Sequence, residues 1–445
     1  MKWILFGLLA SSTCAFAQTS TTTTEAISIT APAGEVTEVA PEATPTPETT
    51  LVVSAPKVKK EKPAFEHKAY GYFSFSRRET FKTIQNLEPI ERNEIDFAEV
   101  AFEGEYQLTP TSKIEFEVEF EHGGVGTTIE FDPFEEFGEF EQEIEQGGEV
   151  AVPELYYKKT FTSTDSALQV GRFPLFISLG SILTKPHKYP TILASDLEIR
   201  MIPMNWTETG IQFEQKFQEA TFRAATVSGL NSEFFRSYNW VGGGHQLKLE
   251  KSNSDDLAIL GSLEWGSISK GQGLAVSYYT GNTTSNRYKV DKLKDEANVT
   301  IWSAMLNWKF GRFGVSGEYI QGDLQNSEKV VAANSTLGGL AKPKAFAPLG
   351  KTAVLQSGMV SYDLTDDFVI YVKAEHVDTF ANVDGNIAKN PRYDVSRRSG
   401  GFMWTWDTAM FLKAQYAREH TELEGLPETY QASLAVGFDL DTFNN

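Results

Sequence analysis

The stretch Ile114-Glu115-Phe116-Glu117-Val118-Glu119-Phe120-Glu121 alternates an apolar residue with a glutamate four times without interruption. Successive side chains of a β-strand point to opposite faces, so the apolar residues share one face and the carboxylates share the other. Similar alternation recurs along the chain, with aromatic residues on the apolar side. The pattern predicts a wall with lipid on one side and water on the other, which is typical of a transmembrane β-barrel.

Residues 1–17 are organised like a signal peptide. Lys2 supplies a positive charge, Trp3 to Ala10 form an apolar core, and Ala15-Phe16-Ala17 makes a small-x-small cleavage site. The only cysteine, Cys14, lies in this segment, so the mature chain is expected to have no disulfide. These features predict export.

Residues 18–63 are rich in Thr, Pro, Ala and Glu, and we expect a disordered periplasmic leader because so few apolar groups cannot offset the entropy of ordering. The basic run 57–62 that closes the leader is either a solvated linker or a contact with peptidoglycan or a periplasmic partner. Residues 64–445 are expected to form the barrel.

The fold class predicted for the barrel is all-β and antiparallel, with about 16 strands, short periplasmic turns and long extracellular loops. A single-chain barrel of this type needs an even strand number, so the segment 245–251 is assigned to a loop. No apolar run after residue 17 is long enough for a membrane-spanning helix. The predicted strands are 67–78, 92–107, 112–122, 149–161, 166–173, 207–217, 219–229, 256–265, 271–280, 297–310, 312–322, 352–363, 367–377, 395–407, 409–420 and 428–439. The predicted long connections are 79–91, 123–148, 174–206, 230–255, 281–296, 323–351 and 378–394.

Charged residues opposite the apolar face are expected to line an aqueous lumen. The predicted lumen residues are Glu115, Glu117, Glu119, Glu121, Glu154, Lys158, Arg172, Lys216, Glu318, Lys373 and Lys413, with Arg397 and Arg398 as further candidates.

The connection 174–206 is predicted to fold into the lumen as a constriction. It carries a basic cluster, Lys185, His187, Lys188 and Arg200. Bases placed opposite the glutamate row would set a transverse field across the bore, which sorts solutes by charge.

The connection 123–148 carries eight acidic residues and no basic one between Glu130 and Glu145. Its carboxylates are candidate ligands for Ca²⁺ or Mg²⁺, which would bridge the loop to lipopolysaccharide. The spacing is not that of an EF-hand, and a solvated acidic loop or an acidic flap are the alternatives. The candidate ligands are Glu135, Glu136, Glu139 and Glu141.

Composition and motifs argue against two other classes of function. The formal net charge of −20 disfavours nucleic acid as a partner, because phosphate binding needs a basic face. The six histidines are scattered, and neither H-E-x-x-H nor G-x-S-x-G occurs. We therefore expect no enzyme and no cofactor.

Several short motifs recur in the part of the chain expected to form the barrel. They are 119–124 (EFEHGG), 134–139 (FEEFGE), 147–150 (GGEV), 171–173 (GRF), 202–210 (IPMNWTETG) and 278–282 (YYTGN). These motifs resemble those of the porins grouped around the phosphate-selective porins O and P, and more closely those of uncharacterised barrel porins of Gram-negative bacteria. The resemblance implies a 16-stranded, homotrimeric channel with an inward-folded loop. It does not imply phosphate selectivity, because those porins use lumen lysines and arginines where this chain has glutamates. The chain also departs at its end, where two asparagines follow Phe443.

The sequence thus predicts a passive diffusion channel for small hydrophilic solutes or ions in the outer membrane. The main alternative is a barrel plugged by its loops that serves a structural or surface-binding role. Two further alternatives are a barrel hydrolase, which needs a serine beside a histidine, and a soluble all-β domain, which needs no detergent.

Overall fold

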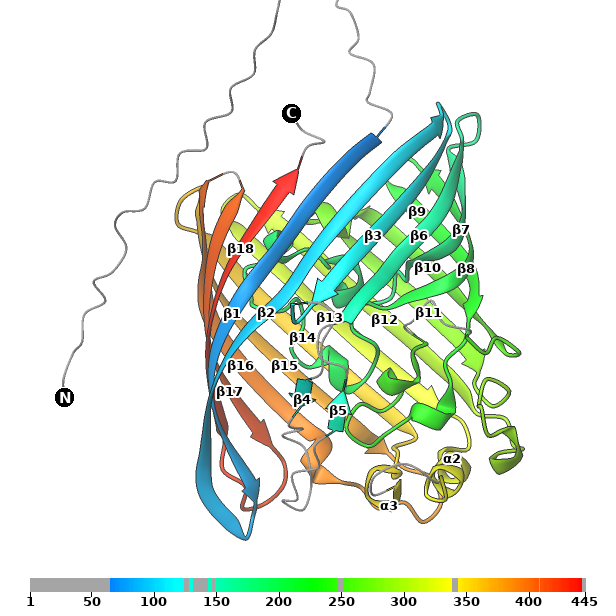
Figure 1. The fold of residues 1–445 in the computed structure, drawn as a ribbon, viewed down its shortest axis with the longest axis vertical. Coiled ribbons are helices and arrows are strands. Elements are labelled where there is room, and N and C mark those ends of the chain that lie inside the picture. The colour runs from blue at the N-terminus through cyan, green and yellow to red at the C-terminus, as the bar shows by residue number, and fades with distance from the viewer. Residues whose placement is uncertain are drawn as a thin grey trace, which may run out of the picture. The chain divides into compact units, whose positions relative to one another are not determined.

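Sixteen antiparallel strands form one closed barrel in which the first strand pairs with the last (Figure 1). The computed structural model describes residues 65–123, 128–130, 143–145, 149–246, 252–337, 343–407 and 409–441. The predicted signal peptide and leader lie outside these residues. No helix in the described ranges is long and apolar enough to cross a membrane.

The barrel strands match the sixteen predicted windows closely, and three have the predicted bounds. They are β1 (Phe65–Thr83), β2 (Asn86–Thr109), β3 (Ser112–Glu121), β6 (Glu149–Phe161), β7 (Ser166–Pro174), β8 (Thr207–Phe217), β9 (Ala220–Ser228), β10 (Leu257–Ser267), β11 (Gln272–Asn282), β12 (Asn298–Phe310), β13 (Phe313–Leu324), β14 (Thr352–Asp363), β15 (Phe368–Asn382), β16 (Asp394–Asp407), β17 (Met410–Thr421) and β18 (Thr429–Asp441).

The remaining elements lie in the connections. A separate two-stranded sheet joins β4 (Thr128–Glu130) to β5 (Glu143–Glu145), so β3 pairs with β6 in the wall. The helices are α1 (Leu179–Ile182), α2 (Ser327–Asn334) and α3 (Pro343–Phe346). The 3₁₀ turns are η1 (Pro186–Lys188), η2 (Glu198–Arg200), η3 (Ser232–Phe234), η4 (Gly242–Gly244), η5 (Ile268–Lys270), η6 (Val290–Lys292) and η7 (Pro391–Tyr393).

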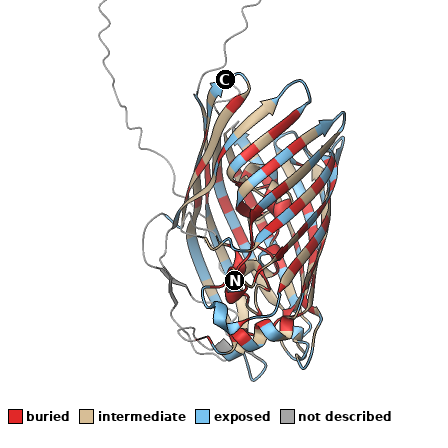
Figure 2. Ribbon diagram, turned by 90° about the vertical axis from the view of Figure 1, so that its right-hand side faces the viewer, coloured by how far each residue is buried: buried red, intermediate tan, exposed pale blue. Residues whose placement is uncertain are grey.

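Exposure alternates along the strands with the sidedness expected of a membrane barrel (Figure 2). On β11 the side chains of Leu274, Val276 and Tyr278 are exposed, whereas Ala275 and Ser277 between them are buried. The apolar faces predicted on 297–310, 367–377 and 428–439 likewise point outward. An extensive apolar outer face is stable in lipid and costly in water, which disfavours the soluble alternative.

Two details of the wall differ from the prediction. Residues 79–91 are not a long loop, because β1 and β2 continue as a ribbon and are joined by residues 84–85 alone. Strand β2 also contains a bulge opposite Phe73. Before the bulge the even-numbered residues, such as Asp96, face inward, and after it the odd-numbered residues, such as Glu99, do so. The bulge explains why the facing of this strand cannot be read from simple alternation.

The long connections fold over and into the barrel and pack an apolar core against its inner wall. The loop side chains Trp206, Phe235 and Trp240 are fully buried there. The wall contributes residues such as Val227 and Leu355, which lie close to the strand ends that meet the long loops. The segment 245–251, of which only residues 245–246 are described, lies between β9 and β10 and is not needed to close the barrel.

Candidate channel constriction

The connection between β7 and β8, residues 175–206, runs through the interior of the barrel and contacts strands far from its own ends. We call it the constriction loop. Ser277 on β11 donates a hydrogen bond to the carbonyl oxygen of Phe176, at 2.6 Å. The backbone N–H of Leu179 donates to Glu318 on β13, at 2.8 Å. The outgoing arm of the loop is thereby held against the wall formed by β11 and β13.

The middle of the constriction loop reaches the opposite wall. Lys185 forms an ion pair with Glu103 on β2. His187 lies 2.5 Å from Asp439 on β18, measured between Nδ1 and a carboxylate oxygen. Burial opposes protonation of Lys185, but the Glu103 carboxylate outweighs it and raises the pKa of the lysine. The loop therefore crosses the bore from one side of the barrel to the other.

Lys413 on β17 holds the turn that follows. Its ammonium donates to the carbonyl oxygens of Pro186 at 2.5 Å and Thr191 at 2.8 Å, and it lies 4.1 Å from the centre of the Tyr189 ring. Only 1% of Lys413 is exposed. This lysine contacts the loop backbone rather than the water of a lumen.

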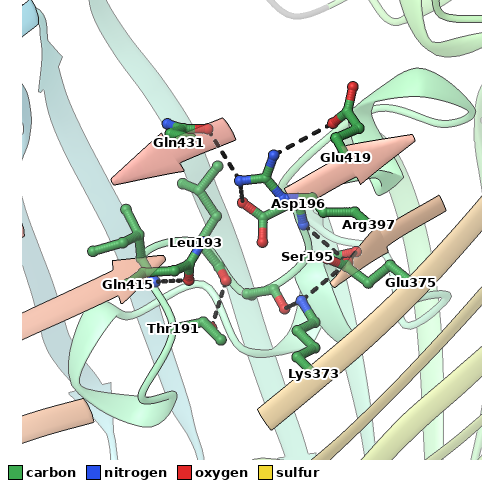
Figure 3. Close-up of polar contacts among 12 residues, drawn as sticks. Thr191, Leu193, Ser195, Asp196, Lys373, Glu375, Arg397, Gln415, Glu419 and Gln431 are labelled. Atoms are coloured by element: carbon green, nitrogen blue, oxygen red, sulfur yellow. Dashed lines mark hydrogen bonds and ion pairs between the residues drawn. The ribbon is translucent and has the colours of Figure 1, made fainter. Parts of the chain in front are cut away.

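The returning arm is fixed by a network of charged side chains on β15, β16 and β17 (Figure 3). Lys373 donates to the Ala194 carbonyl oxygen at 2.8 Å and pairs with Glu375 at 3.0 Å. The Glu375 carboxylate accepts hydrogen bonds from the Ser195 hydroxyl and the Asp196 N–H, each at 3.1 Å.

Arg397 extends the same network toward β17 and β18. Its guanidinium lies 3.3 Å from both Asp196 and Glu419 and donates to Gln431 at 3.0 Å (Figure 3). Glu419 also pairs with Arg200 of the loop at 2.7 Å. The basic residues on this side are thus each matched by a carboxylate or a carbonyl oxygen.

Glu198 ties the two arms of the constriction loop to each other. Its carboxylate accepts hydrogen bonds from the Ser178 hydroxyl at 2.5 Å and the Gly180 N–H at 3.1 Å. Burial raises the pKa of Glu198 well above its ordinary value, and the nearby Glu318 carboxylate adds to the shift. A Cβ atom at position 180 would collide with this carboxylate, so the contact requires glycine there.

A wall of carboxylates on β2, β3 and β6 faces the middle of the constriction loop. Glu103 lies opposite Glu117 in the β2–β3 pairing, and Glu117 lies opposite Glu154 in the β3–β6 pairing. Like charges at directly opposed positions repel one another, so such an arrangement needs water or counter-ions beside it. We call this set the acidic wall. Its members are Glu99, Glu103, Glu105, Glu115, Glu117, Glu119, Glu121 and Glu154.

Hydrogen bonds from tyrosines and lysines hold part of the acidic wall in place. Tyr70 donates to Glu117, and Tyr156 donates to Glu115 at 2.8 Å. Lys113 lies 2.6 Å from Glu105 and 2.9 Å from Glu115. The side chains of Glu105 and Glu115 are 21% and 26% exposed, so water reaches this surface.

The other predicted lumen residues lie at different depths. Lys158 is opposite Lys113 in the strand pairing, and the 63%-exposed side chain of Lys216 lies near a short turn. Arg172 is buried at the root of the constriction loop, where it donates to Thr207 at 3.1 Å and to the Gln246 carbonyl at 3.4 Å. Lys188 is exposed on η1.

The prediction that Arg398 lines the lumen is wrong. Adjacent residues of a strand face opposite ways, and because Arg397 points inward, Arg398 is exposed on the outer face.

Sequence reasoning missed the β2 half of the acidic wall and the loop carboxylates Asp196 and Glu198. Glu99, Glu103 and Glu105 of β2 all occupy odd-numbered positions and therefore share one face, which is a detectable signal, but the bulge before Glu99 conceals which face it is.

The predicted cation ligands Glu135, Glu136, Glu139 and Glu141 lie outside the described residues. Within the described ranges, no group of three or more His, Cys, Asp or Glu side chains is placed to hold a metal ion.

No family model matches the chain. An uncharacterized protein of Aquifex aeolicus (strain VF5) is 22% identical over 341 residues, which cover 75% of this chain and 72% of that protein.

Three solved porin or channel structures are similar in fold and distant in sequence. OmpF of Salmonella typhi has a TM-score of 0.50 at 10% identity, over 85% of this chain and 98% of its own. OprB of Pseudomonas putida has a TM-score of 0.51 at 8% identity, over 85% and 94%. The outer membrane channel DcaP of Acinetobacter baumannii has a TM-score of 0.51 at 9% identity, over 86% and 99%. The chain therefore has the all-β, 16-stranded fold of Gram-negative outer-membrane porins.

Proposed function

We propose that this protein is an outer-membrane channel for passive diffusion of small hydrophilic solutes or ions, and that it prefers cations. The observation that carries the proposal is the acidic wall facing a loop that crosses the interior of the barrel. The wall is partly accessible to water, with 17%, 21% and 26% of the side chains of Glu103, Glu105 and Glu115 exposed. Rings and rows of carboxylates favour cations in channels of many kinds.

The constriction loop sets the width of the bore in this proposal, and the acidic wall sets its charge. The loop bases Lys185 and Arg200 are each paired with a carboxylate, and the wall bases Lys373 and Lys413 donate to loop carbonyls. The transverse field expected from free loop bases is therefore weakened. On the acidic wall, carboxylates such as Glu117 and Glu119 still outnumber the basic side chains. Both lie on β3, between the glutamate-bearing strands β2 and β6.

The remaining features belong to the same proposal. Residues 1–17 direct export and are removed, and residues 18–63 stay in the periplasm, because β1 begins at the barrel end that carries the short turns. The resemblance to the phosphate-selective porins O and P supports a homotrimer. Phosphate is not proposed as the solute, since the wall opposite the constriction loop is acidic.

A plugged barrel is the second candidate, and the apolar core favours it. Loop residues such as Trp206 and Trp240 fill part of the interior and are fully buried. The acidic loop 123–148 would then be the binding surface for cations or a partner.

Planar-bilayer recordings of the purified protein distinguish the two candidates. A diffusion channel gives open conductance steps, whereas a folded barrel that gives none is plugged. Replacing Glu117 and Glu119 by Gln should lower the K⁺ over Cl⁻ permeability ratio toward unity. The control is Glu219→Gln, which removes an exposed carboxylate in the short turn between β8 and β9. An unchanged ratio in the double variant would exclude the acidic wall as the selectivity determinant.

A further inference from the structure

A polar pocket interrupts the outer, lipid-facing surface of β14, β15 and β16. Its volume is about 420 Å³. Its outward-facing lining residues sit toward the strand ends that meet the long loops, and we call it the outer pocket. These residues are Gln356, Gly358, Ala374, His376, Ser396 and Arg398. Glycine and alanine leave a hollow there because no larger side chain covers the sheet.

Two arginines face each other at the edge of the outer pocket. Arg398 on β16 is directly opposite Arg418 on β17. Like charges at such positions repel, so an anion between them would be stabilising. Arg418 forms an ion pair with Glu428, whereas Arg398 has no hydrogen bond or ion pair with any described residue. His376, 2.8 Å from Asp394, adds a ring that can donate a further hydrogen bond when it is protonated.

The surface next to the arginines is apolar. The adjoining outward-facing row, one step closer to the short turns, consists of Val360, Val372, Gly400 and Tyr416. Of these, Val372 is 66% exposed and Tyr416 is 57% exposed. A molecule that satisfied both surfaces would carry an anionic group and, beside it, hydrocarbon chains that point toward the middle of the bilayer.

We propose that the outer pocket binds the phosphate of an outer-leaflet glycolipid of the lipid A class. Arg398 and Arg418 contact the phosphate, and the acyl chains lie over Val360, Val372 and Tyr416. Phosphate suits the site because a guanidinium donates two parallel hydrogen bonds to it. The proposal rests on the outer-membrane location and on the long loops being extracellular, and it does not depend on conduction.

The test measures lipid binding by the full barrel in non-ionic detergent. Native mass spectrometry compares phosphorylated lipid A, dephosphorylated lipid A and inorganic phosphate. Wild type should prefer phosphorylated lipid A, and each of Arg398→Gln and Arg418→Gln should weaken its binding about tenfold, as expected for a lost charge-assisted hydrogen bond. Arg398→Lys should recover part of the loss. The control is Arg312→Gln, at an exposed position in the short turn between β12 and β13.

Three results would overturn the proposal. Equal affinity for the two lipids would show that the phosphate is not recognised. Equal affinity for lipid A and inorganic phosphate would show that the acyl chains do not contribute to binding. If Arg398→Gln dissociated an oligomer in lipid-free detergent, the pocket would instead be a contact between copies of this chain. Heat-modifiable migration on gels confirms that each variant is folded. Single-channel conductance of Arg398→Gln should equal that of wild type, so failure of this proposal is separable from failure of the channel function.

Discussion

A single buried lysine shows how the wall positions the constriction loop. Lys413 places an ammonium between two carbonyl oxygens of the loop and against the Tyr189 ring, with almost no contact with solvent. Burying a charge is costly unless it is hydrogen-bonded, and here the loop backbone supplies the acceptors. The loop conformation and the burial of this lysine therefore depend on each other.

Replacing Lys413 by Met should loosen the loop. The substitution leaves the carbonyls of Pro186 and Thr191 without this donor, and we expect a loss of roughly 3–6 kcal/mol of stability, the range for two hydrogen bonds to a charged group. Thermal unfolding in detergent and the noise of the open channel measure the two effects. Lys216→Met is the control, because that side chain is 63% exposed. Equal noise in both variants would show that Lys413 does not restrain the loop.

His245 gives the long connections a dependence on pH. The residue is buried and donates from Nε2 to the Thr207 carbonyl at 2.7 Å, and burial lowers its pKa from 6.5 to about 3 despite that hydrogen bond. The nearby Arg172 lowers it further. Between these two pKa values the unfolded chain binds more protons than the folded one. The stabilisation is therefore complete above pH 6.5 and is lost as the pH falls toward 3.

Acidification to pH 4.5 should cost roughly 3 kcal/mol in wild type, about 1.4 kcal/mol for each of the two pH units below 6.5, and much less in His245→Gln. Tryptophan fluorescence during denaturant unfolding reports the change, because Trp206 and Trp240 are buried in the same core. The matched control is His67→Gln, which removes an exposed histidine near the start of β1. A parallel loss in wild type and His245→Gln would assign the pH effect to other groups.

At the scale of elements, the constriction loop has two kinds of attachment. Its ends, including Leu175 and Met201, are buried in the apolar core, while its middle is held by polar contacts to β2, β17 and β18. The buried ends of the loop therefore stabilise the barrel, whereas its middle narrows the bore.

Replacing residues 184–193 by a Gly/Ser segment of equal length should raise single-channel conductance. The exchange removes the contacts of Lys185 and His187 and the loop carbonyls that accept hydrogen bonds from Lys413. It leaves in place the two ends of the loop, which are buried in the apolar core. Conductance in planar bilayers is the measurement. A Gly/Ser exchange of residues 386–389, in the connection between β15 and β16, serves as the control. Unchanged conductance would place the loop outside the path of ions.

Strand positions were predictable because each strand must present apolar side chains to lipid and polar ones to the interior. The prediction failed at 79–91, where β1 and β2 extend as a charged ribbon with residues such as Arg77 and Glu91 paired at 2.7 Å. A ribbon beyond the bilayer needs no apolar face, so the alternation that marks a strand disappears there. The contacts of Lys373 and Lys413 were equally unpredictable, since their partners are loop carbonyls about 180 to 227 residues away.

At the scale of the barrel, the even strand count was predictable from topology, but the register that closes the ring was not. Strand β1 pairs with β18 over twelve residue pairs, from Lys68 with Asp441 to Glu79 with Tyr430. This pairing leaves no free edge, which is what allows a sheet to reside in a membrane.

A cysteine pair across this seam tests the closure directly. Ser74 is opposite Ala435, and both face inward, so Ser74→Cys with Ala435→Cys should form a disulfide on mild oxidation. Residues at opposed positions of antiparallel strands lie about 4.5–5.5 Å apart between Cα atoms, within the range for disulfides. Cys14 is the chain's only cysteine, so replacing it by Ser leaves no competing thiol. The control pair, Ser74→Cys with Ser399→Cys, joins strands separated by β17 and β18 and should stay reduced. The crosslinked species should migrate faster than the reduced one on denaturing gels, because the disulfide ties the two ends of the barrel together. Oxidation of the control pair alone would require a different order of strands around the ring.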